Sequence, residues 1–209
     1  EQGAVDMEQV CKMVDTFLER GYTYFDTAYM YHAGQSEIAA REALVKRHSR
    51  DSFTLATKMP LMRFKDGGTK AGQDAVFHEQ LEKCGVEYFD YYLLHNINKT
   101  SYETAKRLDT FAYLQEQKAA GKIRHLGFSF HDKADFLDEV LTAHPEVEFV
   151  QIQLNYLDWE DERVQSRKCY ETIVRHGKKV VVMEPVKGGK LAAVPEAAAA
   201  LMKEAHPDW

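Results

Sequence analysis

Three ionisable side chains each directly follow a run of apolar, aromatic or β-branched residues. They are Asp26, Lys58 and His95, which come after residues 23–25, 53–57 and 91–94. A fourth polar group, the phenol of Tyr31, lies five residues beyond Asp26. Hydride addition to a carbonyl carbon leaves negative charge on oxygen, which must be protonated or stabilised as it forms. A set of Asp, Tyr, Lys and His at one site could protonate this oxygen and stabilise its charge.

Each residue type fits one step of such a reduction. A tyrosine phenol has an ordinary pKa of about 10 and donates poorly near neutral pH unless a nearby ammonium group stabilises its phenolate. We therefore expect Tyr31 to be the general acid, with Lys58 beside it. Asp26 would hold Lys58 in place, and His95 would orient the carbonyl oxygen.

Each of the four residues also has a simpler interpretation when taken alone. Asp26 could cap the turn after its strand, and Tyr31 is one of eleven tyrosines. Lys58 could extend to solvent, and His95 could be a hydrogen-bonded histidine of the core. All four together at one face favour an active site.

Strand-like and helix-like segments alternate along the chain. Strands are expected at residues 23–25, 53–58, 89–94, 123–128, 149–154 and 180–183. Helical periodicity covers residues 10–18, 36–44, 73–83, 102–120, 133–143, 160–175 and 196–204. Strands that alternate with helices form parallel sheets, so the carboxyl ends of these strands should share one face.

This alternation predicts an α/β fold, either a (β/α)8 TIM-type barrel or an open doubly wound sheet. No Gly-x-Gly-x-x-Gly follows the first strand, which removes the main support for a dinucleotide-binding open sheet. We expect a single barrel domain over residues 1–209 with about six of the eight βα units. The first and last strands are missing from this count, so the chain resembles a truncated barrel or a fragment of one.

Composition excludes several classes of function. The net charge is −6 with no basic block, so nucleic-acid binding has no electrostatic support. No apolar stretch approaches the length of a membrane helix, and the first residues lack a signal-peptide core, so we expect a cytoplasmic protein. The three cysteines and nine histidines are scattered, so no metal site is expected. The two exposed edges of an incomplete barrel could support a homo-oligomer.

Six motifs in order resemble the aldo-keto reductase family. They are Phe25-Asp-Thr-Ala-Tyr-Met-Tyr31 with Ser36-Glu37, Thr57-Lys58, Phe89-Asp-Tyr-Tyr-Leu-Leu-His95, residues 121–129, Gln151-Ile-Gln-Leu-Asn-Tyr156 and Glu184-Pro-Val-Lys-Gly-Gly-Lys-Leu191. The resemblance implies the same roles for Asp26, Tyr31, Lys58 and His95, a small-molecule carbonyl substrate, and NADP or NAD as the cofactor. Residues 155–159 and 183–189 are most similar to the subgroup that carries a C-terminal iron–sulfur, ferredoxin-like segment.

The resemblance also implies a set of cofactor-binding residues. Ser129 and Gln151 match the positions that bind the carboxamide, although the Asn that often follows that Ser is Phe130 here. The turn with backbone N–H groups and two cations that would suit a pyrophosphate contains Glu184, Val186, Gly188 and Lys190; an ordinary glycine turn is its simpler interpretation. The family's phosphate-binding segment after the last strand is absent, so cofactor affinity is expected to be weak or lost.

The sequence therefore predicts an NAD(P)H-dependent reductase of aldehydes or ketones. One alternative is a non-catalytic or regulatory binding protein on the same scaffold. A second alternative is a metal-dependent barrel hydrolase.

Overall fold

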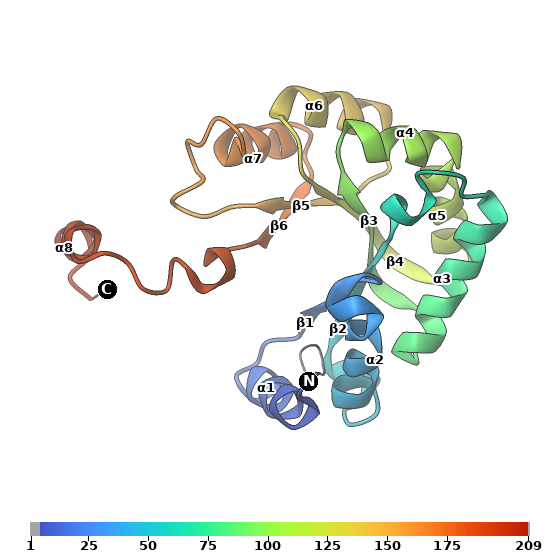
Figure 1. Ribbon diagram of the computed structural model, residues 1–209, viewed down its shortest axis with the longest axis horizontal. Helices are drawn as coiled ribbons and strands as arrows, with labels where there is room; N and C mark the ends of the chain where they lie inside the picture. Colours follow the sequence, from blue (N-terminus) through green and yellow to red (C-terminus); the bar gives the residue numbers. More distant parts are fainter. Residues whose placement is uncertain (1–4, 209) are drawn as a thin grey trace.

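Six parallel strands form one curved sheet in the order β1-β2-β3-β4-β5-β6. The computed structural model describes residues 5–208, and Figure 1 shows the strands curling into an incomplete barrel. The strands are β1 (Tyr24–Asp26), β2 (Thr54–Met59), β3 (Phe89–Ile97), β4 (Ile123–Phe130), β5 (Phe149–Gln153) and β6 (Lys179–Met183). The expected parallel α/β barrel with about six βα units is confirmed.

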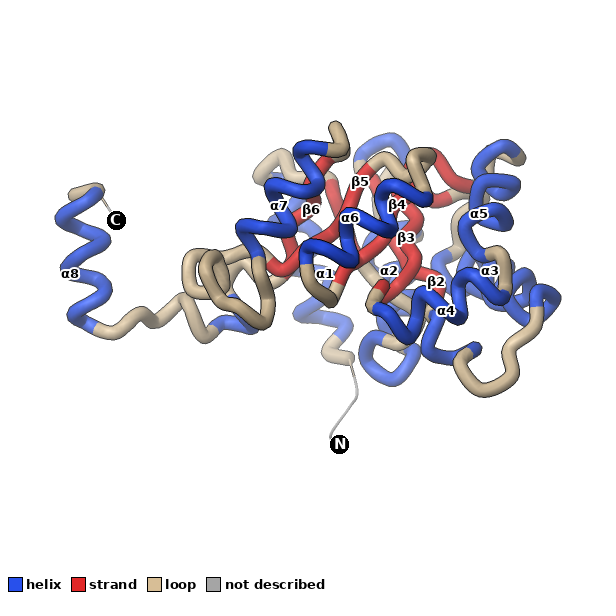
Figure 2. The backbone as a smooth tube through the Cα atoms, turned by 90° about the horizontal axis from the view of Figure 1, so that it is seen from above, coloured by secondary structure: helices blue, strands red, loops and turns tan. Residues whose placement is uncertain are grey.

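Helices surround the convex side of the sheet (Figures 1 and 2). They are α1 (Met7–Glu19), α2 (Ser36–Ala40), α3 (Lys70–Cys84), α4 (Lys99–Arg107), α5 (Thr110–Ala119), α6 (Ala134–Ala143), α7 (Ser166–Arg175) and α8 (Glu196–Ala205). One π-helical turn, Arg41–Val45, continues α2. The last helix, α8, projects away from the rest of the chain and buries none of its residues.

Two expected helices differ from the structure. The helix expected at 102–120 is two helices, because Asp109 takes a left-handed conformation with φ 50° between α4 and α5. The helix expected at 160–175 begins only at Ser166. The Asp161 carboxylate accepts hydrogen bonds from the backbone N–H groups of Arg163 and Val164, which stabilises a turn in place of the helix.

The sheet separates two apolar regions. The larger one lies between strands and helices, whereas the smaller one, Ala56, Leu93 and Phe149, lies on the inner face of the sheet. The ring of Phe149 occupies the space beside Gly127, where a Cβ atom would lie 2.6 Å from that ring. This close approach requires glycine at residue 127 and sets the spacing between β4 and β5.

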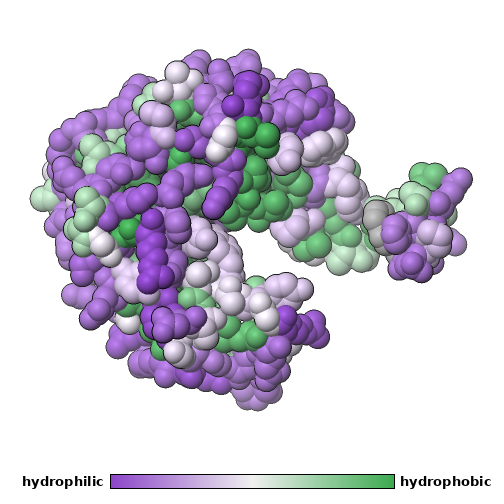
Figure 3. All heavy atoms as spheres, turned by 180° about the vertical axis from the view of Figure 1, so that it is seen from behind, coloured by the Kyte–Doolittle hydropathy of each residue, from purple (hydrophilic) through white to green (hydrophobic). Residues whose placement is uncertain are grey.

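The open side of the barrel lies between β1 and β6. Within residues 5–208, each of these two strands pairs with a single neighbour. Figure 3 shows the resulting hollow, with hydrophobic side chains gathered along part of its wall. Among the described residues no helix has the length and apolar character required to cross a membrane.

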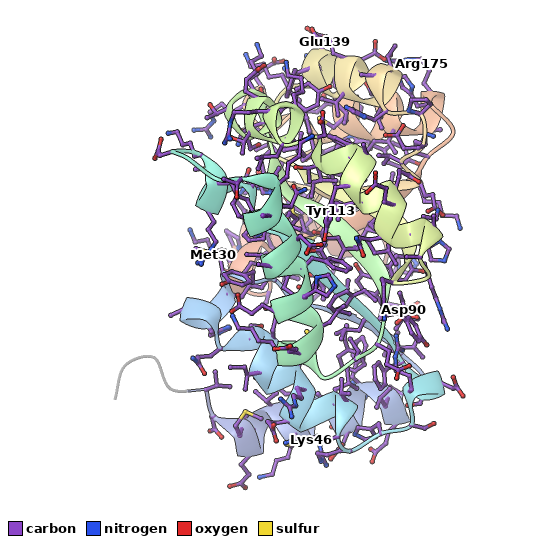
Figure 4. The ribbon with its side chains drawn as sticks, turned by 90° about the vertical axis from the view of Figure 1, so that its right-hand side faces the viewer. Met30, Lys46, Asp90, Tyr113, Glu139 and Arg175 are labelled. Atoms are coloured by element: carbon purple, nitrogen blue, oxygen red, sulfur yellow. The ribbon has the colours of Figure 1, made fainter. Side chains whose placement is uncertain are left out.

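The two ends of the barrel differ in chemistry. Figure 4 shows Met30, in the loop after β1, and Asp90, at the start of β3, at opposite ends of the strands. Asp90 is buried and accepts hydrogen bonds from Arg50, from Arg124 at 3.0 Å and from the Leu55 backbone N–H at 2.9 Å. The Met30 end carries the residues singled out for chemistry.

Candidate active site

Lys58 is the central charged group of the barrel mouth. It lies near the end of β2, and its side chain is only 1% exposed. The ammonium group donates hydrogen bonds to the Asp26 carboxylate and, at 2.9 Å, to the Thr27 carbonyl. Burying an ammonium group is costly unless it is paired and hydrogen-bonded. The last residue of β1 and the residue after it therefore supply both hydrogen-bond partners of the buried Lys58 ammonium group.

Asp26 connects two strands on different sides of the mouth. Its carboxylate, 25% exposed, accepts hydrogen bonds from the Tyr24 hydroxyl at 3.3 Å and from the Gln151 amide at 3.1 Å. Gln151 lies on β5, so this bond spans the barrel from β1. Burial and the neighbouring Asp26 charge raise the pKa of Tyr24 well above its ordinary value, which keeps that phenol neutral and able to donate.

Tyr31 stands at the mouth between Lys58 and His95. The Lys58 ammonium lies 4.9 Å from the centroid of the Tyr31 ring, and the rings of Tyr31 and His95 are 5.6 Å apart at 83°. Tyr31 remains 39% exposed, so a substrate can reach it. The chain turns sharply just after it, because His32 and Ala33 both adopt left-handed conformations. The four residues expected to act together are therefore brought together.

His95 is the neutral member of the set. Burial, followed by the charge of Lys58 and by His131, lowers the pKa of His95 to about 4. The imidazole is therefore uncharged near neutral pH and carries one N–H donor. Within residues 5–208 its ring makes no hydrogen bond, so that donor is available to a substrate oxygen.

Ser129 and Gln151 lie side by side at the mouth, on the paired strands β4 and β5. Both are buried. The Ser129 hydroxyl accepts a hydrogen bond from the Asn96 backbone N–H at 2.8 Å. Asn96 has φ 61°, and the pairing of β3 with β4 shifts register there, directly after His95. Ser129 thus fixes the irregular end of β3, a role that the sequence did not reveal.

The turn after β6 differs in part from the expected phosphate-binding feature. Gly188 takes φ 64°, but several N–H groups of residues 187–191 donate to carbonyls of the same turn. One of its two cations, Lys187, is paired with the Asp158 carboxylate at 2.6 Å. The other, Lys190, is exposed and makes no salt bridge within the described residues. The structure thus leaves one cation of this turn available to an anion.

Asp158 holds this turn against the loop after β5. Besides Lys187 it accepts hydrogen bonds from the amides of Gln153 and Asn155, each at 2.7 Å. The Asn155 amide also donates to the Glu184 carbonyl at 3.1 Å. The Asn155–Trp159 motif signalled a family resemblance in the sequence but gave no sign of this cross-link.

The metal-hydrolase alternative requires a cluster of metal-ligating side chains. In the described part of the chain, no three His, Cys, Asp or Glu residues converge in a way that could hold an ion.

Comparison with known proteins shows which family the chain resembles. A family model described as "Aldo/keto reductase family" matches residues 1–208. Methylglyoxal reductase YeaE of Escherichia coli is 34% identical over 118 residues, which cover 56% of this chain and 38% of that protein. Norsolorinic acid reductase B of Aspergillus parasiticus is 28% identical over 138 residues, which cover 61% of this chain and 35% of that protein.

A solved structure shows a similar fold. The holo form of the aldo-keto reductase AKR11C1 from Bacillus halodurans matches with a TM-score of 0.69 and 26% identity, over 93% of this chain and 63% of that one. The chain thus spans little more than a third of the length of these curated relatives and about two thirds of this structure.

Proposed function

Because this chain belongs to the aldo/keto reductase family, we propose that it reduces aldehydes or ketones to alcohols with NADPH or NADH, using Tyr31 as the general acid. One observation carries the proposal. A lysine that is 1% exposed is held between a carboxylate and a carbonyl, with the Tyr31 ring 4.9 Å from its ammonium group. A buried cation beside an accessible phenol favours the negative charge that the phenol acquires when it gives up its proton.

Each of the four residues would have a separate role in the reaction. Tyr31 donates its proton to the carbonyl oxygen as negative charge develops there. Lys58 stabilises the phenolate that remains, and Asp26 keeps Lys58 in position. His95, neutral because of its lowered pKa, donates its N–H to the same oxygen and orients the substrate.

The residues at the mouth fit the nicotinamide end of the cofactor. When bound, the nicotinamide cofactor supplies the hydride. The Ser129 hydroxyl accepts from Asn96 and keeps its own hydrogen available, while Gln151 uses its N–H on Asp26 and keeps its carbonyl oxygen. One donor and one acceptor match a carboxamide. The turn with Glu184, Val186, Gly188 and Lys190 would face the phosphates, with Lys190 as its free cation.

Three finer expectations belong to the same proposal. The motifs at residues 155–159 and 183–189 support membership of the iron–sulfur subgroup. The unpaired edges of β1 and β6 support association between copies of the chain. The net charge of −6 without a basic block supports a protein with no nucleic-acid partner, and the three unpaired cysteines support a cytoplasmic location.

Two measurements test the proposed reaction. The first titrates NADPH and NADH while following cofactor fluorescence; the second follows reduction of a test aldehyde by the wild type and by Tyr31→Phe. We expect weak cofactor binding by both proteins and turnover only by the wild type. Turnover by the variant would refute the acid role of Tyr31. Cofactor binding without turnover by the wild type would favour the non-catalytic binding protein.

A further inference from the structure

A buried carboxyl group lies directly behind the active-site lysine. Glu37, in the first turn of α2, is 0% exposed. Its Oε1 atom accepts hydrogen bonds from the Thr57 hydroxyl and the Gln80 amide, both at 2.6 Å. Its Oε2 atom is buried and has no hydrogen-bond partner among the described residues. Nothing in the proposed chemistry so far uses this group.

The hydrogen bonds of Glu37 extend to the backbone of Lys58. The Gln80 amide that donates to Glu37 also donates to the Lys58 carbonyl at 3.1 Å. The Tyr92 hydroxyl donates in turn to the Gln80 side-chain oxygen, and both residues are fully buried. The backbone at residues 57 and 58 is therefore fixed from the helix side by Glu37, Gln80 and Tyr92.

The same turn of α2 holds the other half of the site. Ser36, the neighbour of Glu37, accepts a hydrogen bond from the Thr27 hydroxyl at 2.8 Å. The Thr27 carbonyl is one of the two acceptors for the Lys58 ammonium. Ser36 and Glu37 thus connect α2 to Thr27, which follows Asp26, and to Thr57, which precedes Lys58. Tyr31 lies in the segment between residues 27 and 36.

The environment of Glu37 favours its uncharged form. Burial raises the pKa of the Glu37 carboxyl, and the hydrogen bonds from Thr57 and Gln80 offset this only in part. The charge of Lys83 opposes this rise in pKa, and the charge of Glu79 adds to it. A partnerless buried oxygen is also far less costly on a neutral acid than on a carboxylate.

We propose that Glu37, acting through Gln80 and Thr57, is a positioning residue that fixes Lys58 against Asp26 and Tyr31. Its effect on Lys58 is independent of turnover, whereas its effect on rate rests on the reductase function proposed above. The substitution Glu37→Gln keeps the accepting oxygen and places an amide where the partnerless oxygen lies. Glu37→Ala removes the acceptor and leaves a cavity.

The direct test measures how accessible the Lys58 amine is. Wild type and variants are treated with an amine-acylating reagent, and modification at Lys58 is quantified over time by mass spectrometry. We expect Glu37→Ala to accelerate labelling at least about tenfold, the factor that ~1.4 kcal/mol represents. Glu37→Gln should remain within about twofold of wild type, because Gln keeps the oxygen that accepts from Thr57 and Gln80 and leaves neither donor unsatisfied.

A matched control separates positioning from general loss of stability. The Thr110 hydroxyl donates to Gln73 in an equally buried pair on α5 and α3, away from Lys58. Thr110→Val should lower stability while Lys58 stays protected. If Glu37→Ala does not fold, Thr57→Val removes the two hydrogen bonds of the Thr57 hydroxyl, to Glu37 and from Gln80, with little change in shape, and should give a smaller acceleration. The proposal would be overturned if Lys58 were labelled equally fast in wild type and in Glu37→Ala, or in Thr57→Val where that variant replaces it. It would also be overturned if Lys58 of Glu37→Gln were labelled as fast as Lys58 of Glu37→Ala.

Kinetics provide the second arm. Displacing Lys58 should lower kcat for Glu37→Ala at least about tenfold while the NADPH Kd stays within about twofold, and Glu37→Gln should restore kcat. Weaker NADPH binding with unchanged kcat would contradict the positioning role. A wild-type protein without turnover would instead argue against the reductase function, and the labelling experiment would still decide the role of Glu37.

Discussion

Replacing Lys58 with methionine tests the centre of the proposed site. Met has a similar length and no charge, so Lys58→Met removes the cation and little volume. At 4.9 Å from the Tyr31 ring, and with an effective dielectric constant of about 20, a unit charge stabilises a developing phenolate by about 332/(20 × 4.9), or about 3 kcal/mol. Because the charge is spread over ring and oxygen, we take about 2–3 kcal/mol, which lowers kcat about 30–150-fold.

The same substitution affects stability less than activity. The buried Thr27 carbonyl loses its partner, which costs about 1–3 kcal/mol. Asp26 keeps its bonds to Gln151 and Tyr24 and is partly exposed, so it is not left as an isolated buried charge. We therefore expect a folded protein with a low kcat. Urea unfolding and steady-state reduction of a test aldehyde at saturating NADPH measure the two effects.

Another lysine of the chain provides the control. The Lys83 ammonium lies 4.1 Å from the centroid of the Tyr29 ring and pairs with Glu79 at 2.7 Å, which is the same combination of groups outside the mouth. Lys83→Met should leave kcat within about twofold of wild type, as expected for a partly exposed pair. If Lys58→Met keeps more than about a third of the wild-type kcat, the electrostatic role of Lys58 is wrong.

Three further substitutions test the scaffold and the state of His95. Gly127→Ala places a Cβ atom 2.6 Å from the Phe149 ring and its backbone oxygen, so we expect a loss of about 1–3 kcal/mol in urea unfolding; unchanged stability would contradict the close approach. Asp90→Asn weakens the bonds to Arg50, Arg124 and the Leu55 N–H, and should lower stability by about 1–3 kcal/mol while kcat is unchanged, because Asp90 lies at the far end of the barrel. His95 has a pKa of about 4 in the folded chain, below its ordinary value, so the unfolded chain binds this proton more tightly. The stability that His95 contributes is therefore present at neutral pH and is lost as the pH falls from about 6.5 to about 4, a change of about 3 kcal/mol. His95→Asn should remove this part of the acid sensitivity, and identical pH–stability curves for the two proteins would argue against a buried neutral imidazole.

The positions and order of the strands were predictable from local chemistry, although β3 continues to Ile97 and β4 to Phe130, beyond the expected ends at residues 94 and 128. The run from Phe89 is almost wholly apolar or aromatic, as is typical of strands covered on both faces, and it forms β3. Helix boundaries depended on interactions that periodicity does not report. The break at Asp109 is a single left-handed residue, and the late start of α7 follows from the Asp161 side chain.

The residues of the site were predictable from the sequence, but the contacts that hold them in place were not. Parallel strands place Asp26, Lys58 and His95 at one face whatever their contacts, so topology alone brings them together. The near-complete burial of Lys58 depends on its bonds to Asp26 and Thr27, which no local pattern specifies. The pairing of Lys187 with Asp158 is likewise a contact between loops that are distant in sequence.

The hydrogen bond from Gln151 to Asp26 has a consequence for biosynthesis. Its partners are 125 residues apart, so Asp26 leaves the ribosome long before Gln151 is made. At about 5–20 residues per second, this interval lasts roughly 6–25 s. During that time the nascent chain can pair Lys58 with Asp26, but the second partner of Asp26, the Gln151 amide on β5, has not yet been made. The hydrogen bond that joins the two sides of the mouth can therefore form only after β5 has been made.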